Sequence, residues 1–434
     1  MQKHLSLFIL FFLVSFLVFG QSAGDDSASR LAGRAIGNTP LMSDLQELCD
    51  SIGGRITGTP ACDRAIEWGV KKFKQAGLQS VDTESYTVPL LWIPNSAEAS
   101  VTSPEKFSIR IAAAPFSPST PSGGLEAKLV DAGEGTPEDY KKLAESARGA
   151  IALIQTKEMK TLGDLFAEYM RNNALMDAAQ RAGVSAVLLQ STRPRGLLYR
   201  HPIAFGGSYS PMPVAVISRE HAAHLARLAA QGEVRVKLSL QNKTGGAYES
   251  KNVIAEIRGT DKANEIVVLG AHLDSWELGT GAQDNGVNCA LVIDVARAFQ
   301  QLGLHPRRTI RFALFTGEEE GMRGSAGYVH RHAAEMDNHV AMVTFDIGSG
   351  KTTGFYLNGR EELRKPINDI LTAVAGLGTM DHSNEGVDGT DNYDFLLSGI
   401  PNLVANQDAA PYLPDYHAES DVYEMVDARE ARAN

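Results

Sequence analysis

Residues 265–303 read EIVVLGAHLDSWELGTGAQDNGVNCALVIDVARAFQQLG, and this stretch sets the architecture of the chain. The apolar run IVVL predicts a buried β-strand, because a strand covered on both faces is apolar without alternation. The segment VNCALVIDVARAFQQLG has the apolar spacing of a helix. Between the two, a histidine and two aspartates follow the strand directly. A solvated loop does not need that arrangement, so we expect the chemistry of the protein here.

The alternation of strand and helix continues around this stretch. Strands are predicted at NVIAEI (252–257), TIRFALFTG (309–317) and VAMVTFDIG (340–348), and a helix at RGSAGYVHRHAAEM (323–336). Strands that alternate with helices of ten or more residues call for a parallel sheet. The pattern therefore predicts an α/β fold with a mostly parallel sheet and helices on both faces. Ligands of such sheets bind beyond the carboxyl ends of the strands.

Two linkers divide the remainder of the chain. The segments APFSPSTPSGG (114–124) and NKTGGAYES (242–250) are punctuated by Pro, Gly and Ser, which favours domain boundaries. Between them, apolar strands alternate with one or two helices, as in a compact inserted α/β domain. We therefore expect three parts after the N-terminal segment. They are a first part of the catalytic domain at 36–119, an insert at 120–246, and the rest of the catalytic domain at 247–434.

The N-terminal segment predicts a cleaved secretory signal. Lys3 and His4 precede the apolar run LSLFILFFLVSFLVFG, and small residues follow it. The alternative is a permanent membrane anchor, but a span takes about 20 apolar residues and this run is slightly short. We expect a signal peptide at 1–23, no stable membrane span after its cleavage, and a secreted or periplasmic protein.

Charge and cysteines limit the classes of partner. The formal net charge is −11 and the acids are dispersed, which disfavours nucleic acid. Cys49 and Cys62 lie in one short segment, where a disulfide and two free buried thiols both stay open. Cys289 lies among apolar residues, as a core residue does, which argues against cysteine catalysis. For the oligomeric state, a homodimer stays open.

Polar side chains follow the predicted strands at their carboxyl ends. They are His272, Asp274, Asp284, Glu318, Glu319, Glu320, Asp346 and His417. Because these strand ends meet at one edge of the sheet, we expect the side chains to converge. Five such groups, two imidazoles and three carboxylates, would repel or desolvate one another if they converged without a cation. A pair of divalent metal ions resolves that conflict, with Zn²⁺ first and Co²⁺ or Mn²⁺ as substitutes.

Each of these residues alone has a simpler explanation. Asp284 alone would be a helix N-cap, and the three glutamates alone would be first-turn acids favoured by the helix dipole. His417 alone would be a surface histidine. Their coincidence at one sheet edge favours the metal site, with Asp284 as the carboxylate that bridges the ions. His330 and His332 do not fit, because residues two apart on a helix point to different faces, and we expect both in solvent.

With these motifs the chain resembles the co-catalytic zinc peptidases of family M28. The matching segments are HLD (272–274), DNG (284–286), EEEGMRGS (318–325), FD (345–346) and YHAESD (416–421). The insert resembles a protease-associated domain. HLDSW and the turn IGGRITGTPA (52–61) are most similar to the plasma glutamate carboxypeptidase branch. The resemblance covers nearly the whole mature chain and implies a zinc aminopeptidase-like fold.

The resemblance also implies the metal ligands. His272 and Asp346 would hold one zinc ion. Glu319 and His417 would hold the other, and Asp284 would bridge the two. Both ions would therefore depend on one shared carboxylate.

The remaining roles follow from the same resemblance. Glu318 would be the general base, because the spacing EExGxxGS selects Glu318 and Glu319 over Glu320. Asp274 would orient the first metal-bound imidazole. Asp391, in DGTDNYDF, is a candidate to bind the substrate amine, with a plain loop acid as the alternative.

The implied activity is that of an exported metal-dependent exopeptidase acting on dipeptides or short peptides with a free N-terminus. Carboxypeptidase-type specificity stays open as an alternative. A glutaminyl-cyclase-like acyltransferase would use one zinc ion, whereas two sets of ligands are present here. A receptor-like binding protein of the same fold would have lost ligands, and this chain retains all of them.

Overall fold

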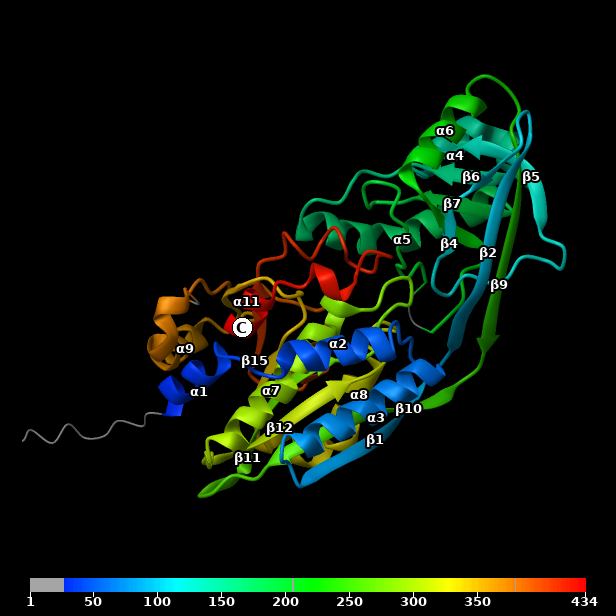
Figure 1. Cartoon of the computed structure of the whole chain (residues 1–434). Helices are drawn as coiled ribbons and strands as arrows, with labels where there is room; N and C mark the ends of the chain where they lie inside the picture. The colour runs from blue at the N-terminus through cyan, green and yellow to red at the C-terminus, as the bar shows by residue number, and fades with distance from the viewer. Residues whose placement is uncertain (1–26, 205–206, 379) are drawn as a thin grey trace, which may run out of the picture.

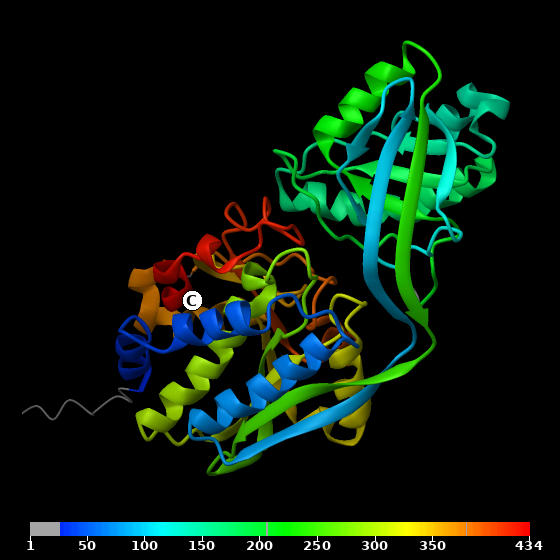
Figure 2. The same cartoon turned by 45° about the vertical axis from the view of Figure 1, so that its right-hand side comes forward.

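The computed structural model describes residues 27–204, 207–378 and 380–434 (Figure 1). The predicted signal peptide, 1–23, lies outside the described residues. Across those described ranges, no helix is long and apolar enough to cross a membrane. The chain forms two units, each built on one sheet, and long strands connect them (Figure 2).

The first sheet has seven strands in the order β1-β10-β12-β11-β13-β15-β14. They are β1 (Ser80–Val88), β10 (Tyr248–Ile257), β11 (Lys262–His272), β12 (Arg308–Phe315), β13 (His339–Thr344), β14 (Thr352–Tyr356) and β15 (Asn402–Gln407). The central strands β12, β11, β13 and β15 are parallel to one another. The pairs β1–β10, β10–β12 and β14–β15 are antiparallel.

The sheet is therefore mixed, and the prediction of a mostly parallel sheet holds for its four central strands but not for the three antiparallel pairs. The physical reason lies in the connections. A parallel crossover needs a dozen or more residues, whereas short loops join β10 to β11 and β13 to β14. A short loop reverses the direction of the chain, so β10 and β14 run against the four central strands.

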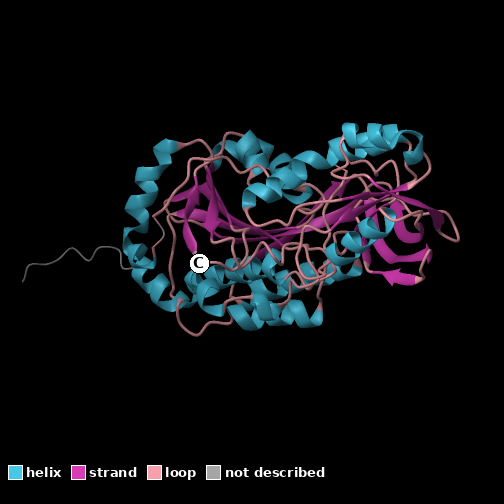
Figure 3. Cartoon of the chain, turned by 90° about the horizontal axis from the view of Figure 1, so that it is seen from above, coloured by secondary structure: helices cyan, strands magenta, loops and turns pink. Residues whose placement is uncertain are grey.

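Helices cover both faces of this sheet, as the sequence predicts (Figure 3). On one face, α2 (Leu41–Ser51), α3 (Pro60–Gln75) and α7 (Val287–Gln301) bury a core with β10, β11 and β12. On the other face, α8 (Arg323–Arg331) and α10 (Tyr393–Leu397) pack on the same strands. Among the described residues, the other α-helices of this unit are α1 (Ser27–Ala35), α9 (Arg364–Leu371) and α11 (Ala428–Ala433).

The second sheet has eight strands in the order β3-β2-β9-β5-β6-β7-β8-β4. They are β2 (Leu91–Ser103), β3 (Phe107–Ile109), β4 (Ile111–Ala113), β5 (Leu125–Asp131), β6 (Ile151–Ile154), β7 (Ala186–Gln190), β8 (Val214–Ile217) and β9 (Arg235–Gly245). Its helices are α4 (Pro137–Leu143), α5 (Leu162–Ala182) and α6 (Arg219–Ala229). Sheet pairing starts at Leu91, so residues 91–113 lie in the second sheet, ahead of the expected boundary at 120.

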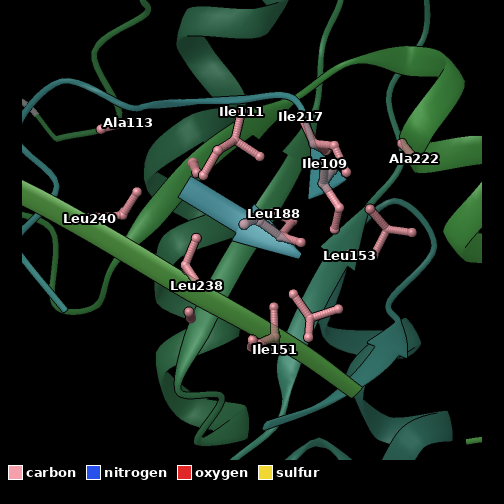
Figure 4. Close-up of a cluster of buried hydrophobic side chains, with 14 of the residues drawn as sticks. Ile109, Ile111, Ala113, Ile151, Leu153, Leu188, Ile217, Ala222, Leu238 and Leu240 are labelled. Carbon is pink, nitrogen blue, oxygen red and sulfur yellow. The ribbon is translucent and has the colours of Figure 1, made fainter. Parts of the chain in front are cut away.

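The second unit has an apolar core of its own (Figure 4). Ile151, Leu153, Leu188 and Ile217 are completely buried on strands β6, β7 and β8. Leu238 of β9 packs into the same cluster. Each fully buried aliphatic side chain contributes about 1.5–3 kcal/mol, so this core stabilises the second unit. The second unit can therefore form a wall of any site at its contact with the first.

Candidate active site

The predicted ligands lie on five segments at the carboxyl ends of the parallel strands. His272 is the last residue of β11, Glu319 follows β12, Asp346 follows β13, and His417 lies in the loop after β15. Asp284 lies in the turn before α7. The structure brings all five together as two groups that could each hold a metal ion. The groups are His272 with Asp284 and Asp346, and Asp284 with Glu319 and His417.

Asp284 belongs to both groups, one oxygen to each. Its Oδ1 lies 3.1 Å from Nε2 of His272, which in turn lies 2.9 Å from Oδ1 of Asp346. Its Oδ2 lies 3.2 Å from Nε2 of His417, which lies 2.9 Å from Oε2 of Glu319. The two carboxylate oxygens of one side chain thus face two separate sets of donors, which is the arrangement that two adjacent ions require.

The hydrogen bonding of the carboxylate oxygens also fits a metal site. Oε1 of Glu319 is buried and makes no hydrogen bond within the described residues, while Oδ2 of Asp284 and Oδ1 of Asp346 face the imidazole nitrogens of their own groups. A buried carboxylate oxygen without a donor is costly, so such atoms call for a cation. Imidazole nitrogens and carboxylate oxygens in groups of three are ligands typical of zinc, with open positions left for water or substrate.

The pKa values of these side chains reflect the attraction between the histidines and the carboxylates. Burial lowers the pKa of His417, but Glu319 and Asp284 outweigh it and raise the value to about 9. Burial likewise opposes charge on His272, yet Asp346 and its acidic neighbours carry the pKa well above the ordinary value. Burial raises the pKa of Glu319 to about 7. The cluster thus takes up protons where a metal ion would otherwise balance the charge.

Glu318 lies beside the metal groups and belongs to neither. It lines the same cavity as His272, Asp284 and His417. Burial raises its pKa well above the ordinary value, while His272 acts in the opposite direction. A carboxyl with raised proton affinity next to a metal site has the properties of a general base.

The Asp274 carboxylate has contacts that the sequence did not indicate. Nδ1 of His272 donates to the backbone oxygen of Asp274 at 3.1 Å, while the Asp274 carboxylate lies 3.7 Å from that nitrogen. The carboxylate itself accepts from the hydroxyl of Thr57 and from the backbone N–H groups of Glu318 and Glu319. Asp274 therefore orients the imidazole through its carbonyl and fixes the glutamate loop through its carboxylate.

Arg55 is a site residue that sequence reasoning missed. It is completely buried. Its guanidinium donates to the carbonyls of Leu273, Thr280 at 2.8 Å and Gly281 at 2.9 Å. Those carbonyls belong to the loop between His272 and Asp284, so Arg55 holds the loop that carries two ligands. The only available signal was the arginine inside the turn IGGRITGTPA, which periodicity does not explain.

Other predicted residues have mixed outcomes. All three cysteines are buried free thiols, so the disulfide alternative for Cys49 and Cys62 is not realised. His330 is exposed as expected, whereas His332 is half-buried and pairs with Glu84 and Glu335. Asp391 is completely buried, and its neighbour Thr390 lines the cavity in its place.

A cavity of about 640 Å³ opens over the metal groups, and both units line it. The second unit contributes the first half of α5, including Leu165, Phe166, Tyr169 and Met170. Tyr169 meets the loop of the first unit at Tyr416, where the two hydroxyls lie 2.6 Å apart. The cavity is thus acidic at the sheet edge and apolar at the wall that α5 provides, and its size suits a small ligand.

His201 couples the stability of this wall to pH. It is buried, with its ring centroid 4.0 Å from that of Tyr169. Burial, opposed by the attraction of Glu168, lowers its pKa from 6.5 to about 3. The unfolded chain takes up a proton at this histidine below pH 6.5 and the folded chain does not, so stability falls as the pH falls.

We expect His201→Phe to reduce the loss of stability between pH 7 and pH 5 by about 2 kcal/mol in the metal-free protein. Chemical denaturation at several pH values measures this. The matched control is His330→Gln, which alters an exposed histidine and should keep the slope of the unchanged protein. Identical slopes for the unchanged protein and His201→Phe would contradict the assignment.

Comparison with known proteins agrees with this geometry. A model of peptidase family M28 matches residues 252–434. Carboxypeptidase Q of Homo sapiens is 26% identical over 389 residues, which cover 89% of this chain and 81% of that protein. Aminopeptidase YwaD of Bacillus subtilis is 28% identical over 407 residues, covering 88% and 79%. The solved structure of a peptidase M28 precursor from Shewanella amazonensis SB2B has a TM-score of 0.85 at 29% identity, covering 94% and 92%.

The fold, the paired carboxylate and histidine groups and these relatives define a metal-dependent peptide hydrolase. The model of peptidase family M28 matches residues 252–434, and these residues contain all five clustered side chains.

Proposed function

We propose that this protein is a di-zinc exopeptidase that removes residues from short peptides with a free N-terminus. The observation that carries the proposal is the position of Asp284, whose two oxygens face two different ligand groups. A single metal ion would need only one of these groups. In this proposal His272 and Asp346 would hold one ion, Glu319 and His417 would hold the other, and Asp284 would be a ligand of both.

The reaction is hydrolysis of a peptide bond by water. Metal ions bound here would lower the pKa of that water and polarise the scissile carbonyl. Glu318 accepts a proton from the attacking water and delivers one to the leaving amine. Asp274 keeps Glu318 in place, because its carboxylate accepts the backbone N–H groups of the glutamate loop. The other side chains that line the cavity would bind substrate and exclude bulk water.

The preference for a short substrate rests on the cavity. The floor of the cavity carries the acidic side chains, and one wall is the apolar face of α5. A substrate with a cationic amine next to an apolar side chain therefore fits the cavity. The relatives carry both names, carboxypeptidase and aminopeptidase. Carboxypeptidase-type specificity is thus the second candidate. We assign residues 120–246, with the strands from Leu91, to a protease-associated insert.

The decisive experiment compares a free dipeptide amide with its N-acetyl form. Acetylation removes the positive charge of the amine and adds bulk. Because the amine helps to position the scissile carbonyl, kcat should fall and KM should rise. A C-terminally amidated and a free-acid dipeptide serve as the matched pair for the other end of the substrate. Equal kcat/KM for the free and acetylated amides would contradict the N-terminal specificity.

Metal analysis of the purified protein separates this proposal from a one-zinc acyltransferase. Two ions per chain are expected, and one would favour the acyltransferase.

Export, through a signal peptide at 1–23, is part of the proposal and rests on the apolar run that follows Lys3. N-terminal sequencing of the exported protein tests it.

A further inference from the structure

The two metal-binding histidines of the proposed site are oriented by different units of the protein. His272 donates its Nδ1 proton to the carbonyl of Asp274, two residues along the same loop. His417 donates its Nδ1 proton to the carbonyl of Arg200 at 2.8 Å, and Arg200 belongs to the second unit. A carbonyl oxygen only accepts, so this contact places the proton on Nδ1 and leaves Nε2 free to bind metal.

Backbone pairing holds the Arg200 carbonyl in this position. The backbone N–H of Arg200 donates to the carbonyl of His417 at 3.0 Å, and that of Glu419 donates to the carbonyl of Leu198 at 3.1 Å. Tyr199 and Ala418 are therefore partners in an antiparallel bridge between the two units. This bridge fixes the imidazole relative to the second unit.

His417 has a backbone conformation that needs such support. Its φ is +58°, in the left-handed region that non-glycine residues adopt at a cost in energy. The pairing with residues 198–200 supplies hydrogen bonds at the carbonyl of His417 and at the N–H of Glu419. Nε of Arg193, also from the second unit and completely buried, donates to the carbonyl of Tyr416 at 3.0 Å.

The Arg200 side chain anchors the bridge to the other ligand loop. It is buried and pairs with Glu277, which lies in the loop between His272 and Asp284, with Nε 3.1 Å from Oε2. It also donates to the carbonyl of Ala113 on β4. One side chain thus connects the second sheet, the loop that carries Asp284, and the carbonyl that accepts from His417.

We propose that Arg200 is a positioning residue for one metal ion, so that the second unit completes the metal site formed by Glu319 and His417, while His272 of the other site is oriented by its own loop. The inference rests on the proposed two-metal function. Partners that orient a metal-bound histidine typically contribute about 10–100-fold to metal affinity. Because the second unit orients the imidazole of His417 directly and contacts the loop of Asp284 through Glu277, the loss should fall mainly on the ion held by Glu319 and His417.

The test is a titration of the metal-free full chain with Co²⁺, followed by its visible absorption. The unchanged protein should bind two ions. Arg200→Met combined with Glu277→Gln removes both members of the ion pair and leaves no unpaired buried charge. This variant should bind one ion normally and the other about 10–100-fold more weakly. Arg200→Lys, which retains a cation for Glu277, should recover part of the loss.

Arg110→Met is the matched control. Arg110 also joins the second unit to the loop of His417, through an ion pair with Glu419 at 2.8 Å, but it is exposed and does not contact Arg200 or His417. The Arg110→Met variant should bind both ions normally. A merely structural role of Arg200 would weaken both ions together, and either that result or two unchanged affinities would overturn the inference.

Two further measurements keep the outcomes distinct. The ¹⁵N NMR signals of His417 in the metal-loaded, unchanged protein should show a protonated Nδ1 and a metal-bound Nε2. The opposite assignment would overturn the inference without any variant. Binding of a single Co²⁺ by the unchanged protein would instead overturn the two-metal proposal.

Discussion

Glu318→Gln should lower kcat by about 10²–10⁴-fold while both metal ions stay bound. The amide has nearly the shape of the carboxylate but cannot accept the proton of the attacking water. Glu318 belongs to neither ligand group, so metal content should not change. Steady-state kinetics and metal analysis of the same preparation measure both parts of the prediction.

The matched control for this variant is Glu320→Gln, in the same run of three glutamates. Burial raises the pKa of Glu320 well above its ordinary value, with Asp274 and Glu319 adding to the effect. Glu320 belongs to neither metal-binding group, and the spacing EExGxxGS excludes it as the base, so this substitution should change kcat little. A large loss in the Glu320 variant with normal turnover in the Glu318 variant would show that the base lies in a different register.

Asp284→Ala should remove both metal ions together. Asp284 is the only side chain that belongs to both metal-binding groups of the described residues. Its loss should weaken each ion by more than the roughly 10–100-fold that partners outside the ligand set contribute. Metal analysis after dialysis at a fixed free zinc concentration measures this, with circular dichroism to confirm that the variant is folded.

Single-ligand variants provide the comparison for Asp284→Ala. His272→Ala and His417→Ala should each weaken mainly one ion, because each histidine lies in one group. Two tightly bound ions in the Asp284 variant would contradict its bridging role. Loss of both ions in either histidine variant would show that the sites are not separable by ligand.

The sequence predicted the clustered side chains well because of a general property of α/β sheets. His272, Asp346 and His417 each follow an apolar strand, and parallel strands bring such ends to one edge whatever their order. That argument needs no knowledge of which strands are neighbours. It also worked for Asp284, since the helix that follows a strand begins at the same edge.

The parts that sequence reasoning missed depend on contacts between distant segments. The pairing of residues 198–200 with 417–419 has no local signature, because any extended backbone can form it. Arg55 acts through backbone carbonyls far along the chain, so its partners leave no pattern of side chains. The assignment of β2 to the second sheet follows from pairing with β9, not from the linker near residue 120.

The two long strands that join the units have a consequence for how such a protein can be assembled. Val88 and Tyr248 are partners at the end of the β1–β10 pair, and Leu91 and Gly245 continue the same ladder in β2 and β9. The chain therefore leaves and re-enters the first sheet at neighbouring points, about 5 Å apart, as in a β-hairpin. A whole folded unit occupies the place of the turn. A tight turn grafted between β1 and β10 would close the first unit topologically, yet it would leave His417 without the acceptor that the excised unit supplies.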